Sequence, residues 1–185
     1  MIYLMRHGKD YEEYVGGWSD ISLTEKGKNK VEKNALWIKD NLKIKKIVSS
    51  DIKRAEETAL ILKDILGLDY ELSDMLREQN KGDLNGKLKS SLNDYEKDLI
   101  ENQKIDTIFP NGERLIDLYN RIKDNIDYFK SLDDDTLIVT HRGVINMFYY
   151  LFNDIELDMD KKRFNVKHAS IHVIDFNNNQ IRRVK

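Results

Sequence analysis

Arginine and histidine side chains that directly follow short apolar runs are the residues of this sequence that could do chemistry. Arg6 and His7 follow the apolar residues 2–5, and His141 and Arg142 follow the β-rich run 136–140. Arg54 comes soon after a weaker apolar run, 47–49, in the expected first turn of a helix. Ligands of open parallel α/β sheets bind at the carboxyl ends of the strands, so we expect these side chains to converge on one rim.

A rim of this kind suits a tetrahedral dianion, and phosphate is the favoured ligand. Guanidinium groups bind phosphate oxygens in a bidentate manner, and the free amides of a helix N-terminus favour an anion as well. A neutral imidazole can attack phosphorus directly, and we therefore predict His7 as the nucleophile. Arg6, Arg54 and a protonated His141 would hold the phosphoryl oxygens.

Glu78 is the predicted acid and base. It follows a short strand expected at 70–72 and precedes the distinct stretch 80–112. Next to a phosphoryl dianion the protonated form of a carboxyl group is favoured, so Glu78 could protonate the leaving oxygen. Once ionised, it could accept the proton of the water that attacks the phosphohistidine.

Alternating strand and helix patterns would position these residues. Ser22 and Glu25 form a capping box before a helix over 24–42, and Ser50 or Asp51 caps a second helix that runs to about residue 66 and ends at Gly67. Helical periodicity continues over 115–129 and 144–152, and a terminal hairpin is expected from strands at 170–176 and 180–184. The alternation predicts a mostly parallel sheet covered on both faces.

The stretch 80–112 differs from the rest, because it combines a helical stripe with no buried strand. The stripe consists of Leu84, Leu88, Leu92, Tyr95 and Leu99. We expect an insertion that lies over the sheet edge and the active site like a lid.

Composition limits the class of protein. The 185 residues are 40% hydrophobic and 35% charged, which predicts one globular domain over 1–185. A net charge of −2 argues against nucleic acid or an anionic membrane as partner, and the apolar amino terminus is too short for a signal or membrane segment. The absence of cysteine fits a reducing compartment, so the expected location is cytoplasmic.

Six motifs, in the same order, resemble those of the histidine phosphatase superfamily, which is also called phosphoglycerate mutase-like. They are RHG at 6–8, GWSD with LTEKG at 17–27, SSDIKRAEETA at 49–59, LREQNKG at 76–82, PNGE at 110–113 and TH at 140–141. The resemblance covers most of the chain. Within the superfamily, the chain is similar to branch 1, of the alpha-ribazole phosphatase and cofactor-dependent mutase type.

The resemblance implies a three-layer α/β/α fold, a phosphohistidine on His7, and no metal or other cofactor. It assigns phosphate binding to Arg6, Arg54 and His141, and acid and base work to Glu78. We assign Gly17 and Arg142 to substrate binding.

Several positions depart from the family pattern. Lys9, Asp10 and the acidic residues that follow replace the usual residues after RHG, and acidic groups there would repel a second phosphate. Arg142 replaces a glycine, and His168 stands where an asparagine is frequent. We expect His168 and His172 to be structural, Trp18 to be a packing residue, and the four histidines to lack the clustered spacing of a zinc site.

The favoured function is hydrolysis of a small phosphorylated metabolite by a monomer or homodimer. A mutase must hold a bisphosphate with basic residues, whereas the stretch 80–112 has five lysines against six acidic residues. Phosphoglycerate mutase and a catalytically silent phosphate-binding protein stay open as alternatives.

Overall fold

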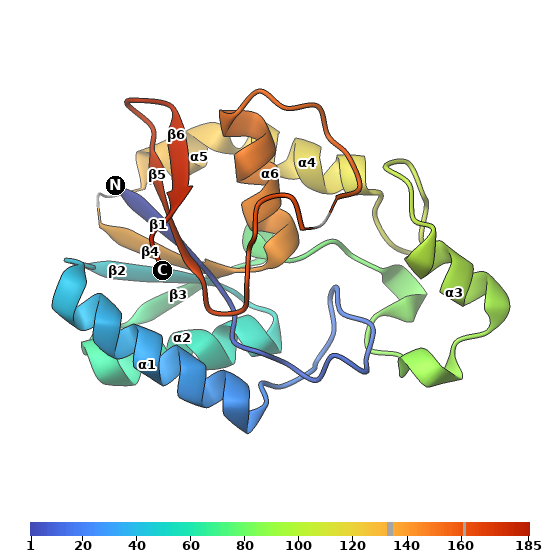
Figure 1. The fold of residues 1–185 in the computed structure, drawn as a ribbon, viewed down its shortest axis with the longest axis horizontal. Helices are drawn as coiled ribbons and strands as arrows, with labels where there is room; N and C mark the ends of the chain where they lie inside the picture. Colours follow the sequence, from blue (N-terminus) through green and yellow to red (C-terminus); the bar gives the residue numbers. More distant parts are fainter. Residues whose placement is uncertain (133–134, 161) are drawn as a thin grey trace.

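The computed structural model describes residues 1–132, 135–160 and 162–185. Its centre is a sheet of six strands in the order β3-β2-β4-β1-β5-β6 (Figure 1). The strands are β1 (Ile2–Arg6), β2 (Lys46–Ser50), β3 (Tyr70–Ser73), β4 (Thr136–Thr140), β5 (Ile171–Asp175) and β6 (Gln180–Arg183). The first four pair in parallel, and β5 and β6 are antiparallel, which confirms the mostly parallel sheet and the terminal hairpin.

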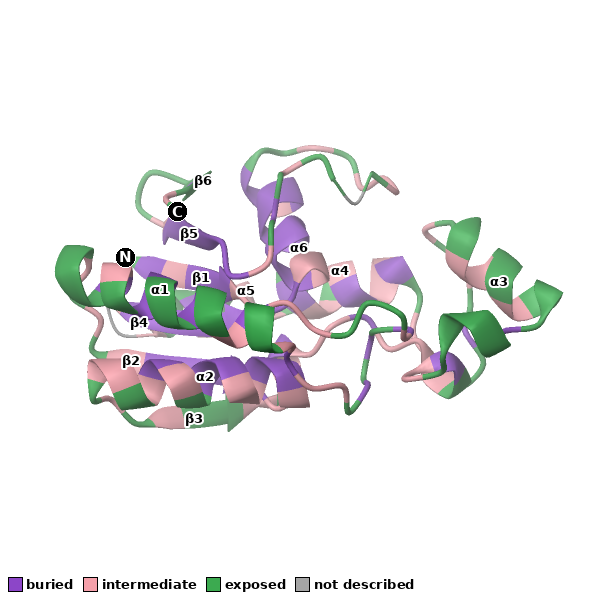
Figure 2. Ribbon diagram, turned by 60° about the horizontal axis from the view of Figure 1, so that its bottom comes forward, coloured by how far each residue is buried: buried purple, intermediate pink, exposed green. Residues whose placement is uncertain are grey.

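Helices cover both faces of the sheet. On one face lie α1 (Glu25–Asn41) and α2 (Lys53–Leu66), and on the other lie α4 (Leu115–Asp124), α5 (Ile126–Ser131) and α6 (Arg142–Phe152) (Figure 1). The arrangement is the expected three-layer α/β/α sandwich. Its buried residues lie along the central strands and α6, while the outer faces of α1 and α2 are exposed (Figure 2).

Two apolar cores result from the alternation of side chains along the strands. In β1, Leu4 packs into the core beneath α4 to α6, and the next residue, Met5, packs into the core beneath α1 and α2. Successive side chains of a strand point to opposite faces, so both faces of β1 are buried. Tyr149, Tyr150 and Phe152 of α6 are buried, as expected for core residues.

The helix caps differ from the predicted ones. Thr24, not Ser22, is the N-cap of α1, because its Oγ1 accepts from the Gly27 amide at 3.1 Å and donates to the Lys9 carbonyl at 3.0 Å. The N-cap of α2 is Ile52, without a side-chain cap. Ser50 Oγ instead accepts from the amide of Ile52, the N-cap residue itself, at 3.3 Å, and Asp51 binds Arg77.

The single helix predicted over 115–129 is two helices, α4 and α5, that meet at Asn125. The Asn125 side-chain amide donates to the Arg121 carbonyl at 2.8 Å. Asparagine side chains compete with the backbone for such carbonyl groups, which favours a helix end here.

Less than half of the segment 80–112 is helical, so the expectation of a mainly helical insertion is wrong, and its stripe does not form one helix. It contains the 3-10 turns Gly82–Leu84 and Lys89–Ser91, and α3 (Asp94–Glu101). Leu88 and Tyr95 of the predicted stripe are exposed, whereas Leu84, Leu92 and Phe109 form a third small core with Val15. The segment lies beyond the carboxyl ends of the strands rather than over an edge strand (Figure 1).

Candidate active site

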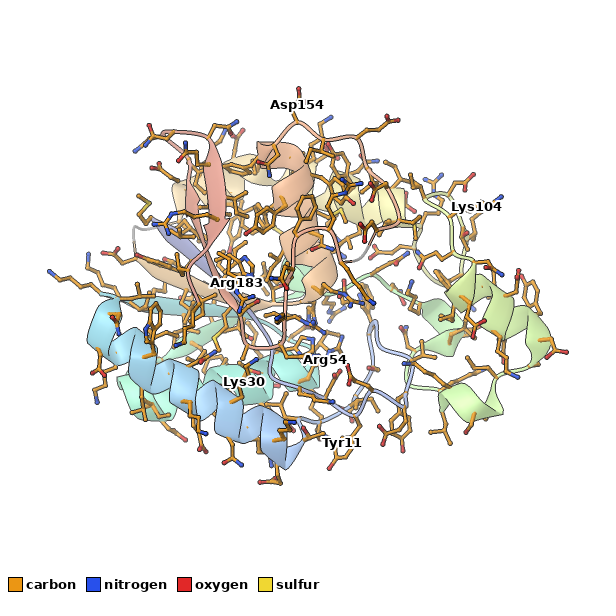
Figure 3. The ribbon with its side chains drawn as sticks, in the orientation of Figure 1. Tyr11, Lys30, Arg54, Lys104, Asp154 and Arg183 are labelled. Atoms are coloured by element: carbon orange, nitrogen blue, oxygen red, sulfur yellow. The ribbon has the colours of Figure 1, made fainter. Side chains whose placement is uncertain are left out.

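A pocket of about 340 Å³ opens at the carboxyl ends of β1 and β4. Six of the predicted site residues line it, namely Arg6, His7, Gly17, Arg54, Glu78 and Arg142. The seventh, His141, is fully buried behind the pocket, with its ring centroid 5.1 Å from that of His7. The structure therefore brings together residues from five separate segments of the chain. Figure 3 labels Arg54 near the centre of the molecule.

His7 is buried and oriented by its own backbone neighbourhood. Nδ1 lies 2.7 Å from the Gly8 carbonyl, an acceptor, so Nδ1 carries the proton and the lone pair resides on Nε2. Nε2 accepts from Arg54 Nε at 3.3 Å. Burial, followed by the charge of Arg54, holds the pKa of His7 well below its usual value, and the ring is neutral in the free protein.

Arg54 is fixed before any ligand arrives. Its side chain is 2% exposed, and it donates to the Gly17 carbonyl at 2.8 Å and to Ser19 Oγ at 3.1 Å. Two nearby carboxylates, Glu57 of the same helix and Asp51 just before it, have other partners, because Glu57 accepts from the Leu23 amide and Asp51 binds Arg77. A preorganised guanidinium stabilises charge without reorganising during a reaction.

Gly17 holds Arg54 through its backbone, and its own conformation requires glycine. Its φ is +76°, and a Cβ atom there would lie 2.3 Å from the Asn85 side chain. The Gly17 carbonyl thus orients Arg54, and the predicted contact of Gly17 with substrate stays a prediction.

Arg6 forms a second wall of the pocket. Its guanidinium donates to the Val166 carbonyl at 3.0 Å and lies 2.6 Å from His168 Nε2. Burial, with a smaller effect of Arg142, lowers the pKa of Arg6 to about 10, so the group remains charged near neutral pH.

The expectation of a protonated His141 does not hold for the ligand-free protein. Burial, followed by the charges of Arg54 and Arg6, lowers the pKa of His141 well below its usual value. Its Nε2 lies 2.9 Å from Ser50 Oγ, and its buried Nδ1 has no hydrogen-bond partner among the described residues. An entering dianion would favour the protonated ring, because an adjacent negative charge stabilises the charged form of an imidazole.

Glu78 lies against the N-terminus of α6. One carboxylate oxygen accepts from the Gly143 amide at 3.0 Å, and the other accepts from the Gln79 amide at 3.0 Å. The two neighbouring cations have other partners, since Arg77 binds Asp51 and the Lys81 ammonium donates to Gln79 and Gln103. The carboxylate therefore faces the pocket in a fixed orientation.

Two residues next to His7, namely His168 and Asp10, were not predicted to belong to the site. His168, expected to be structural, lines the pocket with its ring centroid 5.6 Å from that of His7. Its Nε2 lies 3.6 Å from an oxygen of Asp10, whose other oxygen lies 3.4 Å from Arg54 Nε. Burial raises the pKa of Asp10, but His168 and Arg54 outweigh that effect and lower it overall. The available signal was that both residues depart from the family pattern.

His7, Asp10 and His168 also offer ligand atoms that lie within 4.8 Å of one another, which is close enough for a metal ion. The expectation that the histidines are not clustered as in a zinc site is therefore wrong for His7 and His168, which share Asp10 as a neighbour. Arg6 and Arg54 touch members of this group and would repel a dication.

His172 is structural, as predicted, whereas Trp18 is an exposed residue at the surface. His172 is fully buried between the hydroxyls of Tyr149 and Ser170, each at 2.8 Å. The Trp18 ring packs against Arg77, and its indole donates to the Glu78 carbonyl at 2.7 Å.

A three-layer α/β/α fold whose strand ends carry paired histidines among arginines and one carboxylate defines the histidine phosphatase class. The family model of the histidine phosphatase superfamily (branch 1) matches residues 2–185, and the chain belongs to this superfamily.

Two relatives of this chain carry the name of a mutase. The "Probable phosphoglycerate mutase GpmB" of Erwinia tasmaniensis is 28% identical over 183 residues, 94% of this chain and 84% of that protein. A GpmB of Escherichia coli K12 is 32% identical over 148 residues, 76% and 68% of the two chains.

Solved structures agree on the fold. A phosphoglycerate mutase from Thermus thermophilus superposes with a TM-score of 0.69 at 25% identity, over 100% of this chain and 98% of that one. A mycobacterial glucosyl-3-phosphoglycerate phosphatase gives a TM-score of 0.69 at 22% identity, over 92% and 87% of the two chains.

None of the helices in the described part of the chain has the length and apolar composition of a membrane span.

Proposed function

We propose that this protein hydrolyses phosphomonoesters of a small metabolite through a phosphohistidine on His7. The observation that carries the proposal is the state of that ring. It is buried and neutral, Nδ1 is bound to the Gly8 carbonyl, and Nε2 carries the lone pair beside Arg54. A neutral nucleophile surrounded by fixed cations is what attack on a phosphate dianion requires.

The first step is phosphoryl transfer to the enzyme. Nε2 of His7 attacks phosphorus, the bond from phosphorus to the ester oxygen breaks, and protonated Glu78 gives its proton to the leaving oxygen. Arg6 and Arg54 neutralise the phosphoryl oxygens, and the phosphoryl group favours a protonated His141 that donates to it.

The second step releases phosphate. A water oxygen attacks the phosphorus of phosphohistidine, Glu78 accepts a proton of that water, and the N–P bond breaks. Inorganic phosphate leaves, and His7 and Glu78 return to their starting states.

Phosphoglycerate mutase is the second candidate, and the GpmB relatives favour it. Two insertion lysines line the pocket, but both have partners already. The Lys81 ammonium donates to Gln79 and Gln103, and the Lys89 ammonium donates to the Glu12 carbonyl at 2.5 Å. Hydrolysis remains our first choice, since the insertion offers little free charge with which to close the pocket and keep water away from the phosphohistidine.

The wider proposal is a cytoplasmic enzyme of one domain, a monomer or homodimer, that needs no metal or other cofactor. Residues 80–112 would act as a lid-like wall of its pocket. Its partner would be a small phosphorylated metabolite rather than nucleic acid or a membrane.

The test is a phosphatase assay combined with labelling of the enzyme. We expect turnover of para-nitrophenyl phosphate in the presence of a chelator, and its loss in His7→Ala. During turnover of a ³²P-labelled ester, an alkaline quench should trap label on His7, because phosphohistidine survives alkali and not acid. Label without hydrolysis, together with interconversion of 2- and 3-phosphoglycerate, would favour the mutase. Phosphate binding with neither label nor turnover would favour a silent binding protein.

A further inference from the structure

A second hollow, of about 500 Å³, lies beside the catalytic pocket. We call it the basic groove. One wall comes from α1, with Lys26 and Lys30, and the opposite wall comes from the segment before β5, with Lys162 and Lys167. Figure 3 shows Lys30 on α1, on the side of the helix that faces the centre of the molecule.

The charge of the basic groove is strongly one-sided. Among its described lining residues, seven lysine and arginine side chains stand against a single carboxylate, that of Glu12. Glu12 is itself paired with Lys9 at 2.8 Å. The protein as a whole has a net charge of −2, so the cations are a local concentration and not part of a generally basic surface.

Lys30 shows that these cations influence one another. Burial, followed by the charges of Arg183, Lys167, Arg6 and Lys26, lowers the pKa of its ammonium group. The repulsion involves groups from α1, β1, β6 and the segment before β5. An anion in the groove would relieve it.

The basic groove adjoins the catalytic pocket. Arg6, Arg142, His168 and Glu12 line both hollows, and the Glu12 carboxylate is paired with Lys9. Arg6 lies at the junction, where its guanidinium contacts His168 and the Val166 carbonyl. A ligand whose reacting phosphoryl group lies at His7 can therefore extend past Arg6 and Arg142 toward the lysines of α1.

We propose that the basic groove binds a second phosphoryl group of the substrate, so that the preferred substrates are phosphomonoesters that carry two phosphates. This inference rests on the proposed phosphatase function and adds a substrate class to it. The cations that could hold a second phosphate lie on α1 and before β5 rather than in the insertion, and in the groove they outnumber the acidic group after RHG that was expected to repel it. Arg142, which departs from the family pattern, would contact both ends of such a substrate.

The test compares two substrates that differ by one phosphate, fructose 6-phosphate and fructose 1,6-bisphosphate. We expect a higher kcat/KM for the bisphosphate, and a preference that shrinks as the salt concentration rises. Lys26→Gln/Lys30→Gln should reduce kcat/KM for the bisphosphate roughly tenfold, because each exposed ion pair contributes modestly. The loss should appear mainly as a higher KM, since these lysines bind the phosphate that does not react. Hydrolysis of para-nitrophenyl phosphate should not change.

The matched control is Lys33→Gln/Lys39→Gln, which removes two exposed lysines of the same helix that do not line the groove. It should leave the bisphosphate preference intact, and Lys30→Arg should retain it too. Equal kcat/KM for the two sugar phosphates, or equal losses in both double variants, would overturn the inference while the phosphatase proposal stands. Calorimetric binding of the same pair to His7→Ala tests the groove without turnover, and equal affinities there would overturn it as well.

Discussion

The backbone amide of Gly143 donates to a carboxylate oxygen of Glu78 at 3.0 Å, and the two residues approach so closely that no side chain fits between them. A Cβ atom on Gly143 would lie 2.0 Å from the other carboxylate oxygen. The orientation of the proposed acid therefore depends on a glycine at the start of α6.

Gly143→Ala should displace Glu78 and slow hydrolysis of alkyl phosphates roughly a hundredfold, which is the usual loss when a general acid is misplaced. Steady-state kinetics would measure it. Gly16→Ala is the matched control, because Gly16 also lines the pocket and nothing lies within 4 Å of its added Cβ atom. Equal losses of hydrolysis rate in Gly143→Ala and Gly16→Ala would show that Glu78 does not depend on the glycine at position 143.

Glu78→Gln should distinguish an acid from a merely structural carboxylate. The amide still accepts hydrogen bonds but has no proton to give a leaving oxygen, so rates should fall steeply for alkyl esters and little for para-nitrophenyl phosphate. A series of aryl and alkyl phosphates of increasing leaving-group pKa provides the measurement. A loss of the same size across the series would contradict the assigned role.

Asp10→Asn should strengthen the binding of phosphate. In the free protein the Asp10 carboxylate lies 3.4 Å from Arg54 Nε, where it competes with an entering anion. Its removal should lower the inhibition constant for inorganic phosphate roughly threefold to tenfold. Glu13→Gln removes an exposed carboxylate nearby and serves as control. Weaker inhibition in Asp10→Asn would mean that the carboxylate instead positions Arg54.

Acid should destabilise the protein through buried histidines. Burial lowers the pKa of His172 from its ordinary value of 6.5 to about 4. Between pH 4 and pH 6.5 the unfolded chain binds more protons than the folded protein. The stability that neutral His172 contributes is therefore complete above pH 6.5 and declines as the pH falls toward 4. The contribution of His172 is on the order of 3 kcal/mol.

Urea unfolding above pH 6.5 and at about pH 4.5 would measure this decline in the free energy of unfolding. The decline should be smaller in His172→Gln. The comparison concerns the slope with pH, because the variant also loses hydrogen bonds to Tyr149 and Ser170. An unchanged slope in the variant would show that other groups dominate acid sensitivity.

The site residues that could be predicted from the sequence are those that lie at the end of a strand or soon after it. Arg6 ends β1, His7 and His141 directly follow β1 and β4, and Arg54 lies in the first turn of α2. Parallel pairing brings such positions to one rim. His168 could not be found in this way. It precedes an antiparallel strand, and it reaches His7 because β5 pairs with β1, which local pattern does not reveal.

Helix ends and the insertion were less predictable for a related reason. Ser22 and Thr24 are both acceptable caps, and only the contact between Thr24 and the Lys9 carbonyl selects one. The break at Asn125 rests on one side-chain hydrogen bond. In 80–112, a stripe of apolar residues at helical spacing serves a small separate core, and Tyr95 of that stripe is 65% exposed.

That small core of Val15, Leu84, Leu92 and Phe109 is separate from the two cores of the sandwich. The outer wall of the pocket thus has its own packing, while the arginines and histidines depend on the sheet. Substitutions within this small core can therefore reshape the entrance for esters while the sheet that carries His7 and Arg6 keeps its own packing, provided that the contact between Gly17 and Asn85 is kept.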